Sequence, residues 1–146
     1  MDFKILPLKE QDVDALLEIE SASFSDPWGK SSFLEQIKNP LSKNFGAFVG
    51  DTLVGFIVGI AVLDEASIYI VATKKECRKT GVGRALIRQF SEECGKTGAT
   101  RIYLEVRSRN EGAIKFYEAL GFENIGVRKN FYEKPIDDAI IYTKNI

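Results

Sequence analysis

Apolar and polar residues alternate with two different periods along this chain of 146 residues. Short runs of β-branched and aromatic residues that end in turn or polar residues predict strands. Apolar residues spaced three or four positions apart predict amphipathic helices. We expect strands at residues 3–6, 45–49, 53–63, 67–73, 101–107, 122–128 and 139–143, and helices at 11–22, from about 32, from the turn after 80 to about 96, and at 110–120.

Local signals mark where several of these elements begin. Gly50-Asp51, between two strand-like runs, is typical of a hairpin turn. Ser32 and Glu35 have capping-box spacing, which predicts a helix start near Ser32, and Asn110 is a good N-cap for the last helix. Early strands followed by a strand–helix–strand–helix–strand order predict an α/β protein, with a mixed sheet and helices on both faces.

The length and composition fit one soluble globular domain spanning residues 1–146, with 45% hydrophobic and 28% charged residues. A net charge of −1 argues against binding nucleic acid across the whole surface. No apolar run approaches the ~20 residues of a membrane span, and Asp2 and Lys4 interrupt the N-terminal segment. We therefore expect a cytoplasmic protein that does not bind membranes.

The chain has no histidine, which excludes Ser-His-Asp and Cys-His arrangements and any metal site that needs histidine ligands. Cys77 and Cys94 form no CxxC motif, so reduced thiols and no bound metal are expected. Cys94 continues an apolar helical stripe and is predicted to be a core residue. Acid–base chemistry must then rest on carboxylates, tyrosines, lysines, the thiols or water.

A glycine-rich turn follows the predicted strand at 67–73 and reads Arg-Lys-Thr-Gly-Val-Gly-Arg from Arg78 to Arg84. Gly81 and Gly83 let a ligand approach the backbone closely, and the N–H groups and dipole of the following helix favour an anion. The glycines that a dinucleotide-binding fingerprint or a P-loop requires are absent. The turn predicts a phosphorylated ligand, with an ordinary helix start as the alternative.

Two motifs resemble the GNAT family of N-acetyltransferases. Residues 78–83 resemble its pyrophosphate loop, Arg/Gln-x-x-Gly-x-Gly/Ala, and residues 104–122 resemble its C-terminal signature, a strand followed by Asn-x-x-Ala-Ile-x-x-Tyr and Gly-Phe. The resemblance covers nearly the whole chain in the family's order. Flanking segments narrow it to the bacterial ribosomal-protein-alanine N-acetyltransferase branch: residues 24–28, 64–67, 104–107, 128–132 and 138–141.

This resemblance implies the GNAT fold, a mostly antiparallel central sheet splayed where acetyl-CoA enters. The backbone at 71–73 would pair with the pantetheine arm, although the same residues also read as a plain core strand. In close relatives Asn often stands where this chain has Ile70, so one polar contact near the thioester is expected to be absent. The cofactor-binding residues it implies are Val71, Ala72, Thr73, Arg78, Lys79, Thr80, Gly81, Val82, Gly83, Arg84, Asn110 and Tyr117.

Glu105 is predicted to lie on the polar face of its strand, because Ile102, Leu104 and Val106 form the apolar face. A carboxylate there, acting directly or through water, suits removal of a proton from an ammonium group of pKa ~8. The pattern alone favours a salt bridge with a nearby arginine instead. The resemblance places the catalytic glutamate at Glu105.

Tyr117 shares a helical stripe with Ala113 and Ile114, so its spacing alone predicts a core aromatic. A phenol of pKa ~10 can protonate a thiolate leaving group of pKa ~8.5, and the resemblance places the family's general acid at Tyr117. A main-chain N–H within 71–73 would stabilise the oxyanion. Direct transfer in a ternary complex suits a chain without a histidine-activated nucleophile.

The acceptor that the resemblance implies is the N-terminal amine, an alanine, of a small-subunit ribosomal protein. Trp28, Phe131 and Tyr132 would border the peptide, although core or lid packing explains each nearly as well. Relatives often have a tyrosine in place of Phe131. Four acidic residues either attract a basic peptide or form a solvated acidic surface: Glu20, Asp26, Asp137 and Asp138.

Two other functions remain open from the sequence. A GNAT enzyme could acetylate a small amine or a lysine side chain, because the cofactor half of the fold does not specify the acceptor. A non-catalytic acetyl-CoA-binding module is the alternative from another class, and the presence of both Glu105 and Tyr117 argues against it. The sequence does not determine the oligomeric state.

Overall fold

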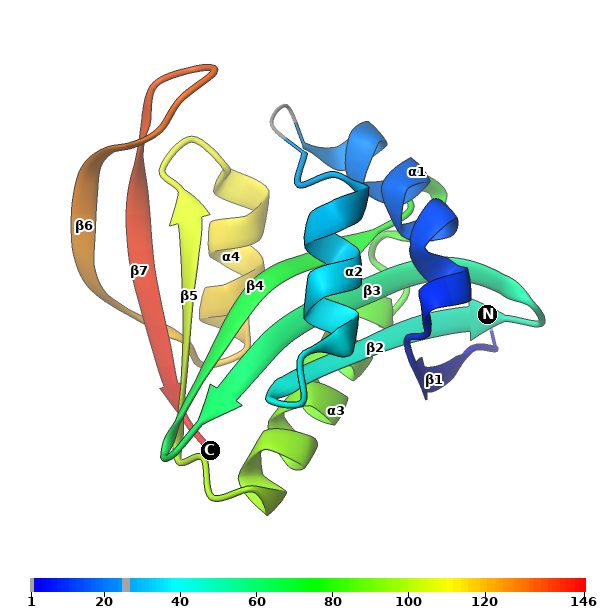
Figure 1. The fold of residues 1–146 in the computed structure, drawn as a ribbon. Coiled ribbons are helices and arrows are strands. Elements are labelled where there is room, and N and C mark those ends of the chain that lie inside the picture. Colours follow the sequence, from blue (N-terminus) through cyan, green and yellow to red (C-terminus); the bar gives the residue numbers. More distant parts are fainter. Residues whose placement is uncertain (1, 25–26) are drawn as a thin grey trace.

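A computed structural model describes residues 2–24 and 27–146. Seven strands of these residues form one sheet in the order β1-β2-β3-β4-β5-β7-β6, and neighbours are antiparallel except β4 and β5 (Figure 1). The elements are β1 (Lys4–Pro7), a 3₁₀ turn (Glu10–Asp12), α1 (Val13–Ser23), α2 (Lys30–Lys38), β2 (Ser42–Val49), β3 (Thr52–Val62), β4 (Glu65–Thr73), a 3₁₀ turn (Lys75–Cys77), α3 (Val82–Lys96), β5 (Arg101–Arg107), α4 (Glu111–Ala119), β6 (Glu123–Tyr132) and β7 (Asp137–Asn145).

Helices cover both faces of the sheet, α1 and α2 on one side and α3 and α4 on the other (Figure 1). Alternation along β3 supplies both cores, because Ile57 belongs to the α3 side and Phe56 to the α1–α2 side. Phe90 of α3 packs on the first side, and Leu16 and Phe33 pack on the second. All five side chains are fully buried, so the α/β sandwich predicted from the sequence is confirmed.

The sheet separates between β4 and β5. These parallel strands pair only where residues 65–67 meet residues 101–103, and beyond that point each continues without the other. The pairing of β4 with β3 also skips Tyr69, because Ile68 pairs with Gly59 and Ile70 pairs with Val58. A bulge bends its strand. The bulge at Tyr69 lies where β4 leaves β5, so the sheet opens into a V at this position (Figure 1).

The helix predicted near Ser32 is present, but the capping box predicted at Ser32 is wrong. Helix α2 begins at Lys30, with Gly29 as its N-cap at φ 90°, so Ser32 lies inside the first turn. A glycine has no side chain to cap a helix. The carboxylate of Glu20 in α1 instead accepts a hydrogen bond from the Gly29 N–H. A partner nine residues away in sequence lies outside the local pattern that defines a capping box.

The predicted strands at the C-terminus are too short. β6 continues to Tyr132, past the expected end at Arg128, because its pairing with β7 is irregular between Arg128 and Tyr132 and obscures the two-residue period. Both cysteines are free thiols, as expected, and both are buried; Cys94 lies in the core as predicted, whereas the burial of Cys77 was not predicted. No helix within residues 2–24 and 27–146 is long and apolar enough to cross a membrane.

Candidate active site

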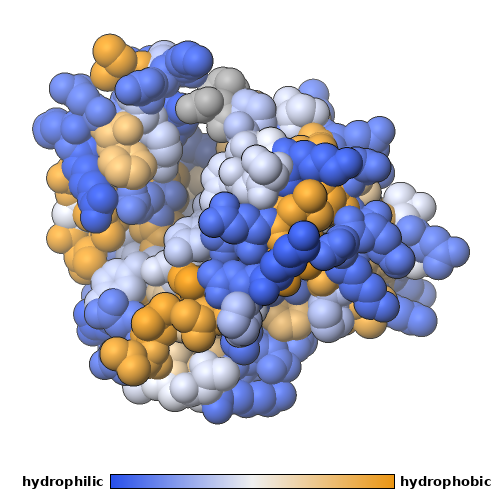
Figure 2. Space-filling model, viewed as in Figure 1, coloured by the Kyte–Doolittle hydropathy of each residue, from blue (hydrophilic) through white to orange (hydrophobic). Residues whose placement is uncertain are grey.

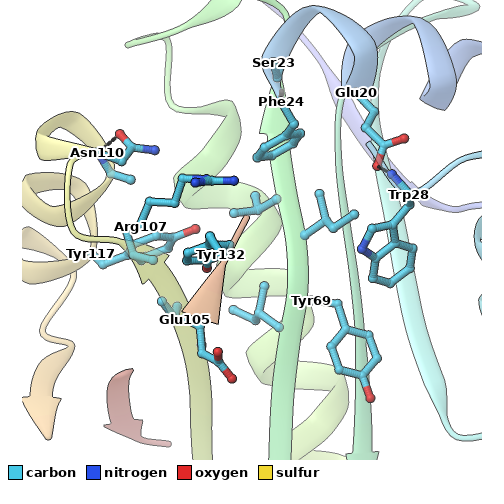
Figure 3. A pocket seen from close by; sticks show the side chains of 16 residues that line it. Glu20, Ser23, Phe24, Trp28, Tyr69, Glu105, Arg107, Asn110, Tyr117 and Tyr132 are labelled. Carbon is cyan, nitrogen blue, oxygen red and sulfur yellow. Dashed lines mark hydrogen bonds between the residues drawn. The ribbon is translucent and has the colours of Figure 1, made fainter. Parts of the chain in front are cut away.

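A cleft of about 440 Å³ lies where β4 and β5 separate. Figure 2 shows the molecule hollowed between the part formed by β6 and β7 and the part formed by α1 and α2. Side chains from both parts and from β4, β5 and α4 line it (Figure 3). Seven residues proposed from the sequence meet there: Glu20, Trp28, Val71, Glu105, Asn110, Tyr117 and Tyr132.

Glu105 lies near the end of β5, on the face opposite the buried Leu104 and Val106, as alternation predicts. Its side chain is 32% exposed, and Oε1 lies 3.9 Å from Nη1 of Arg128. That separation is longer than a hydrogen bond, and exposed pairs of this kind contribute only ~0–1 kcal/mol to stability. An ion pair therefore exists, but it leaves the carboxylate open to the cleft.

Tyr117 is both a core aromatic and a cleft residue. Its ring lies 5.2 Å from that of Phe116 and 5.6 Å from that of Phe122, in edge-to-face geometry, and the residue is only 8% exposed. Burial raises the pKa of the Tyr117 phenol, and the nearby Tyr132 raises it further. The phenol therefore stays protonated at neutral pH and is available as a proton donor at the cleft.

Arg107 holds Tyr132 against the cleft. Its guanidinium lies 4.3 Å from the centre of the Tyr132 ring, and its Nη1 donates a hydrogen bond of 2.9 Å to the Pro135 carbonyl. Burial raises the pKa of Tyr132, the charge of Glu105 adds to this, and Arg107 opposes it. Phe131 packs edge-on against Tyr132 but is 46% exposed, and the described lining of the cleft does not include it.

The solvated acidic surface considered from the sequence is wrong for Glu20 and Asp137, which are both buried. Asp137 accepts hydrogen bonds from the Ser108 hydroxyl, from the Arg109 N–H at 3.2 Å and from the Asp138 N–H at 2.8 Å. The Ser108 hydroxyl is the main reason why the pKa of Asp137 lies below its usual value. Asp137 thereby ties the β6–β7 hairpin to the loop that precedes α4.

The other two acidic candidates differ. Asp138 is paired with the β6 strand, because it accepts hydrogen bonds from Nζ of Lys129 at 3.0 Å and from the N–H of Asn130 at 2.9 Å. Asp26 lies outside the described residues. None of the described carboxylates in this set is therefore positioned as a free acidic surface for a basic peptide.

The glycine-rich turn forms the N-terminus of α3. Gly81 is the N-cap at φ 91°, a conformation that favours glycine, and a Cβ atom there would meet nothing within 4 Å. The N–H groups of the first helical turn have no partner within the helix. At Gly83, by contrast, a Cβ atom would lie 3.1 Å from Cζ of Phe116. The absence of a side chain at Gly83 therefore lets α3 pack closely on α4, which is compatible with the predicted place of Gly83 in a cofactor loop.

Within the described part of the chain, no strand pairs with the edge of β4 that faces β5 beyond Ser67. The Lys74 N–H donates to the Val54 carbonyl of β3 at 2.8 Å, and successive N–H groups of a strand point to opposite edges. Val71 and Thr73 therefore point their N–H groups away from β3, along an edge that leads from the cleft toward the α3 N-terminus. An extended ligand with amide groups fits such an edge, and the α3 N-terminus fits its phosphates.

Two loop residues have local roles as well. Asn110 caps α4 as predicted, because its Oδ1 accepts a hydrogen bond of 3.1 Å from the Ala113 N–H. Arg78 donates from Nε to the Thr73 carbonyl at 3.4 Å and is otherwise exposed. Lys79, Thr80, Val82 and Arg84 complete the turn and the first residues of α3.

The residues that line the cleft without having been predicted as site residues include Tyr69 and Arg107. Arg107 could have been found, because it shares a strand face with Glu105 two residues before it. Tyr69 depends on the bulge in β4, and no sequence pattern indicates that irregularity.

Comparison with known proteins relates this geometry to a family. Residues 13–122 match the model of the acetyltransferase (GNAT) family. A ribosomal protein bS18-alanine N-acetyltransferase of Escherichia coli K12 is 32% identical over 139 residues, which are 94% of this chain and 93% of the relative.

Solved structures agree with this match. The crystal structure of the ribosomal-protein-S18-alanine N-acetyltransferase from E. coli has a TM-score of 0.91 at 31% identity, over 99% of this chain and 94% of that one. The PaiA N-acetyltransferase of Thermoplasma acidophilum, solved in complex with coenzyme A, has a TM-score of 0.83 at 22% identity over the whole of both chains. By the family match and the identity to the E. coli enzyme, this chain belongs to the GNAT family of acetyltransferases.

Proposed function

We propose that this protein transfers the acetyl group of acetyl-CoA to the N-terminal amine of a ribosomal protein, an alanine, directly in a ternary complex. The observation that carries the proposal is that Glu105 and Tyr117, a base and a protonated acid, line one cleft at the separation of β4 and β5. The name of the E. coli relative, which this chain matches along nearly its whole length, supports the choice of acceptor.

In this proposal the first-turn N–H groups of α3 and the guanidinium of Arg78 hold the pyrophosphate. The free N–H groups of Val71 and Thr73 pair with the pantetheine arm, and one of them also stabilises the charge that develops on the carbonyl oxygen. Acetyl-CoA supplies an acetyl thioester. Trp28 and Tyr132, on opposite walls of the cleft, border the acceptor peptide (Figure 3).

Two residues move protons during the transfer. Glu105 takes a proton from the acceptor ammonium, directly or through water, so that the neutral amine can form the new C–N bond. As the C–S bond breaks, Tyr117 gives its phenolic proton to the leaving sulfur and regains one from the nitrogen of the new amide bond, directly or through water, so that Glu105 holds the one proton released overall. The reaction needs no covalent bond to the enzyme.

Arg78→Ala is expected to raise the Kd of coenzyme A about tenfold, the effect of losing one hydrogen bond to a charged group. Isothermal titration calorimetry measures this change. Arg88→Ala is the matched control, because Arg88 is also an exposed arginine but lies farther along α3 and should leave the Kd unchanged. An unchanged Kd in Arg78→Ala would remove this side chain from the cofactor site.

The acceptor is tested with two peptides. A peptide with a free N-terminal alanine should be acetylated at the α-amine, whereas the same peptide with a blocked N-terminus and an internal lysine should react poorly. Near pH 7 an α-amine of pKa ~8 has a useful neutral fraction, and a lysine of pKa ~10.4 is almost wholly protonated. Fragmentation mass spectra locate the label. Equal labelling of both amines would favour the acceptor class of lysine side chains or small amines.

A further inference from the structure

Glu20 is a buried acidic residue in the wall of the cleft. Only 1% of its surface is exposed, and its neighbours on α1, Leu16 and Ile19, are core residues. Burying a carboxyl group is costly unless hydrogen bonds replace its contacts with water. The proton transfers proposed above do not use Glu20, so its position requires another explanation.

The carboxylate of Glu20 binds the backbone at the start of α2. Oε2 accepts a hydrogen bond of 2.6 Å from the Trp28 N–H, and Oε1 accepts one of 3.3 Å from the Gly29 N–H. Gly29 is the N-cap of α2 and carries no side chain. Glu20 therefore accepts hydrogen bonds from the N–H of the N-cap residue and from the N–H of the residue before it, which the helix itself leaves without acceptors.

These two hydrogen bonds hold the backbone that carries Trp28, and packing places its ring. Its ring lies 5.5 Å from that of Phe33, which is fully buried, and 5.8 Å from that of Tyr69 at the bulge of β4. Trp28 and Tyr69 lie together on the side of the cleft opposite Tyr117 (Figure 3). The carboxylate thus connects the core of the α1–α2 layer to the aromatic wall of the cleft.

We propose that Glu20 is a positioning residue for the acceptor: it holds Trp28 in the wall of the cleft and so sets the affinity for the acceptor peptide without touching the reacting atoms. This inference rests on the proposed function, in which Trp28 borders the peptide. Removal of the carboxylate should therefore change the KM for peptide while leaving the KM for acetyl-CoA unchanged.

Trp28 provides a readout that does not depend on activity, because it is the only tryptophan of the chain. Glu20→Leu retains apolar volume and removes both acceptors. We expect its tryptophan emission to move to longer wavelength and its quenching by acrylamide to increase. Glu18→Ala is the matched control, because Glu18 is an exposed carboxylate on the same helix. It should behave like the wild type.

Steady-state kinetics supply the second readout. In Glu20→Leu the KM for a peptide with N-terminal alanine should rise by about two- to tenfold, the cost of ordering the released Trp28 side chain when the peptide binds. The KM for acetyl-CoA should stay at its wild-type value, and kcat should change less than the peptide KM. Glu20→Gln retains an oxygen for the Trp28 N–H and should lie between the wild type and Glu20→Leu.

Unchanged quenching and unchanged peptide KM in a folded Glu20→Leu variant would overturn the proposal. Equal rises in both KM values would also overturn it, because they would indicate a general loss of structure. If melting curves show that Glu20→Leu is unfolded, the test rests on Glu20→Gln. Wild-type fluorescence quenching and a wild-type peptide KM in Glu20→Gln would then overturn the proposal. If the wild type fails to acetylate the peptide, the proposed acceptor is wrong, and the fluorescence still tests whether Glu20 holds Trp28.

Discussion

Replacing Glu105 with glutamine is expected to lower kcat by about 10²–10⁴-fold, the usual loss on removing a general base. Glutamine keeps the size and hydrogen-bonding shape of the side chain but cannot take a proton from the acceptor. The side chain is partly exposed, so the melting temperature and the Kd of coenzyme A should change little. Turnover measured between pH 7 and 9 should partly recover as pH rises, because a larger fraction of the α-amine is already neutral.

Arg128→Ala is the control for the alternative, in which Glu105 is only half of an ion pair. It breaks the same 3.9 Å contact from the other side and leaves the carboxylate in the cleft. Most of the wild-type turnover should remain. Full turnover in Glu105→Gln at neutral pH, or equal losses in both variants, would show that the ion pair is the function of Glu105.

Tyr117→Phe is expected to lower kcat by about 10²-fold or more, because the leaving sulfur no longer receives a phenolic proton. Phenylalanine retains the ring that packs against Phe116 and Phe122, so the melting temperature should stay near that of the wild type. Burial raises the pKa of Tyr117 above its usual ~10. Since the active form is the neutral phenol, wild-type activity should not fall through ionisation of Tyr117 below about pH 10.

Tyr142→Phe controls for the loss of a buried hydroxyl as such. The Tyr142 hydroxyl donates to Oε2 of Glu118 at 3.0 Å, and it is not among the described residues that line the cleft. This variant should lose some stability, typically ~0.5–1.5 kcal/mol for one hydrogen bond, and keep its turnover. Wild-type turnover in Tyr117→Phe would return that residue to a purely packing role.

The sequence predicted the active half of the sheet well because its signals are local. Strand 101–107 has the expected bounds, and the alternation of apolar residues placed Glu105 on the face away from the core. Asn110 caps its helix as its residue type and position indicate. The capping hydrogen bond joins residues three positions apart, and the face of Glu105 follows from the two-residue period of a strand.

Other features were not predicted because their causes lie between separate elements. The contact of Gly83 with the ring of Phe116, through packing of α3 on α4, was not predicted. Glu20 was considered a surface acid, whereas it fastens the start of α2. Gly83 and Phe116 lie on helices far apart in the sequence, and Glu20 reaches from α1 to the start of α2, outside the spacing of a local capping motif.

The sequence by itself therefore determined the class of fold and most of the strands and helices, and it supplied the candidate residues for acid–base chemistry. Only the tertiary structure decided which of them meet. The separation of β4 from β5, the bulge at Tyr69 and the contact of Arg107 with Tyr132 together define the cleft. Local periodicity records which face of an element is apolar, but the path of the folded chain decides which faces share a cavity.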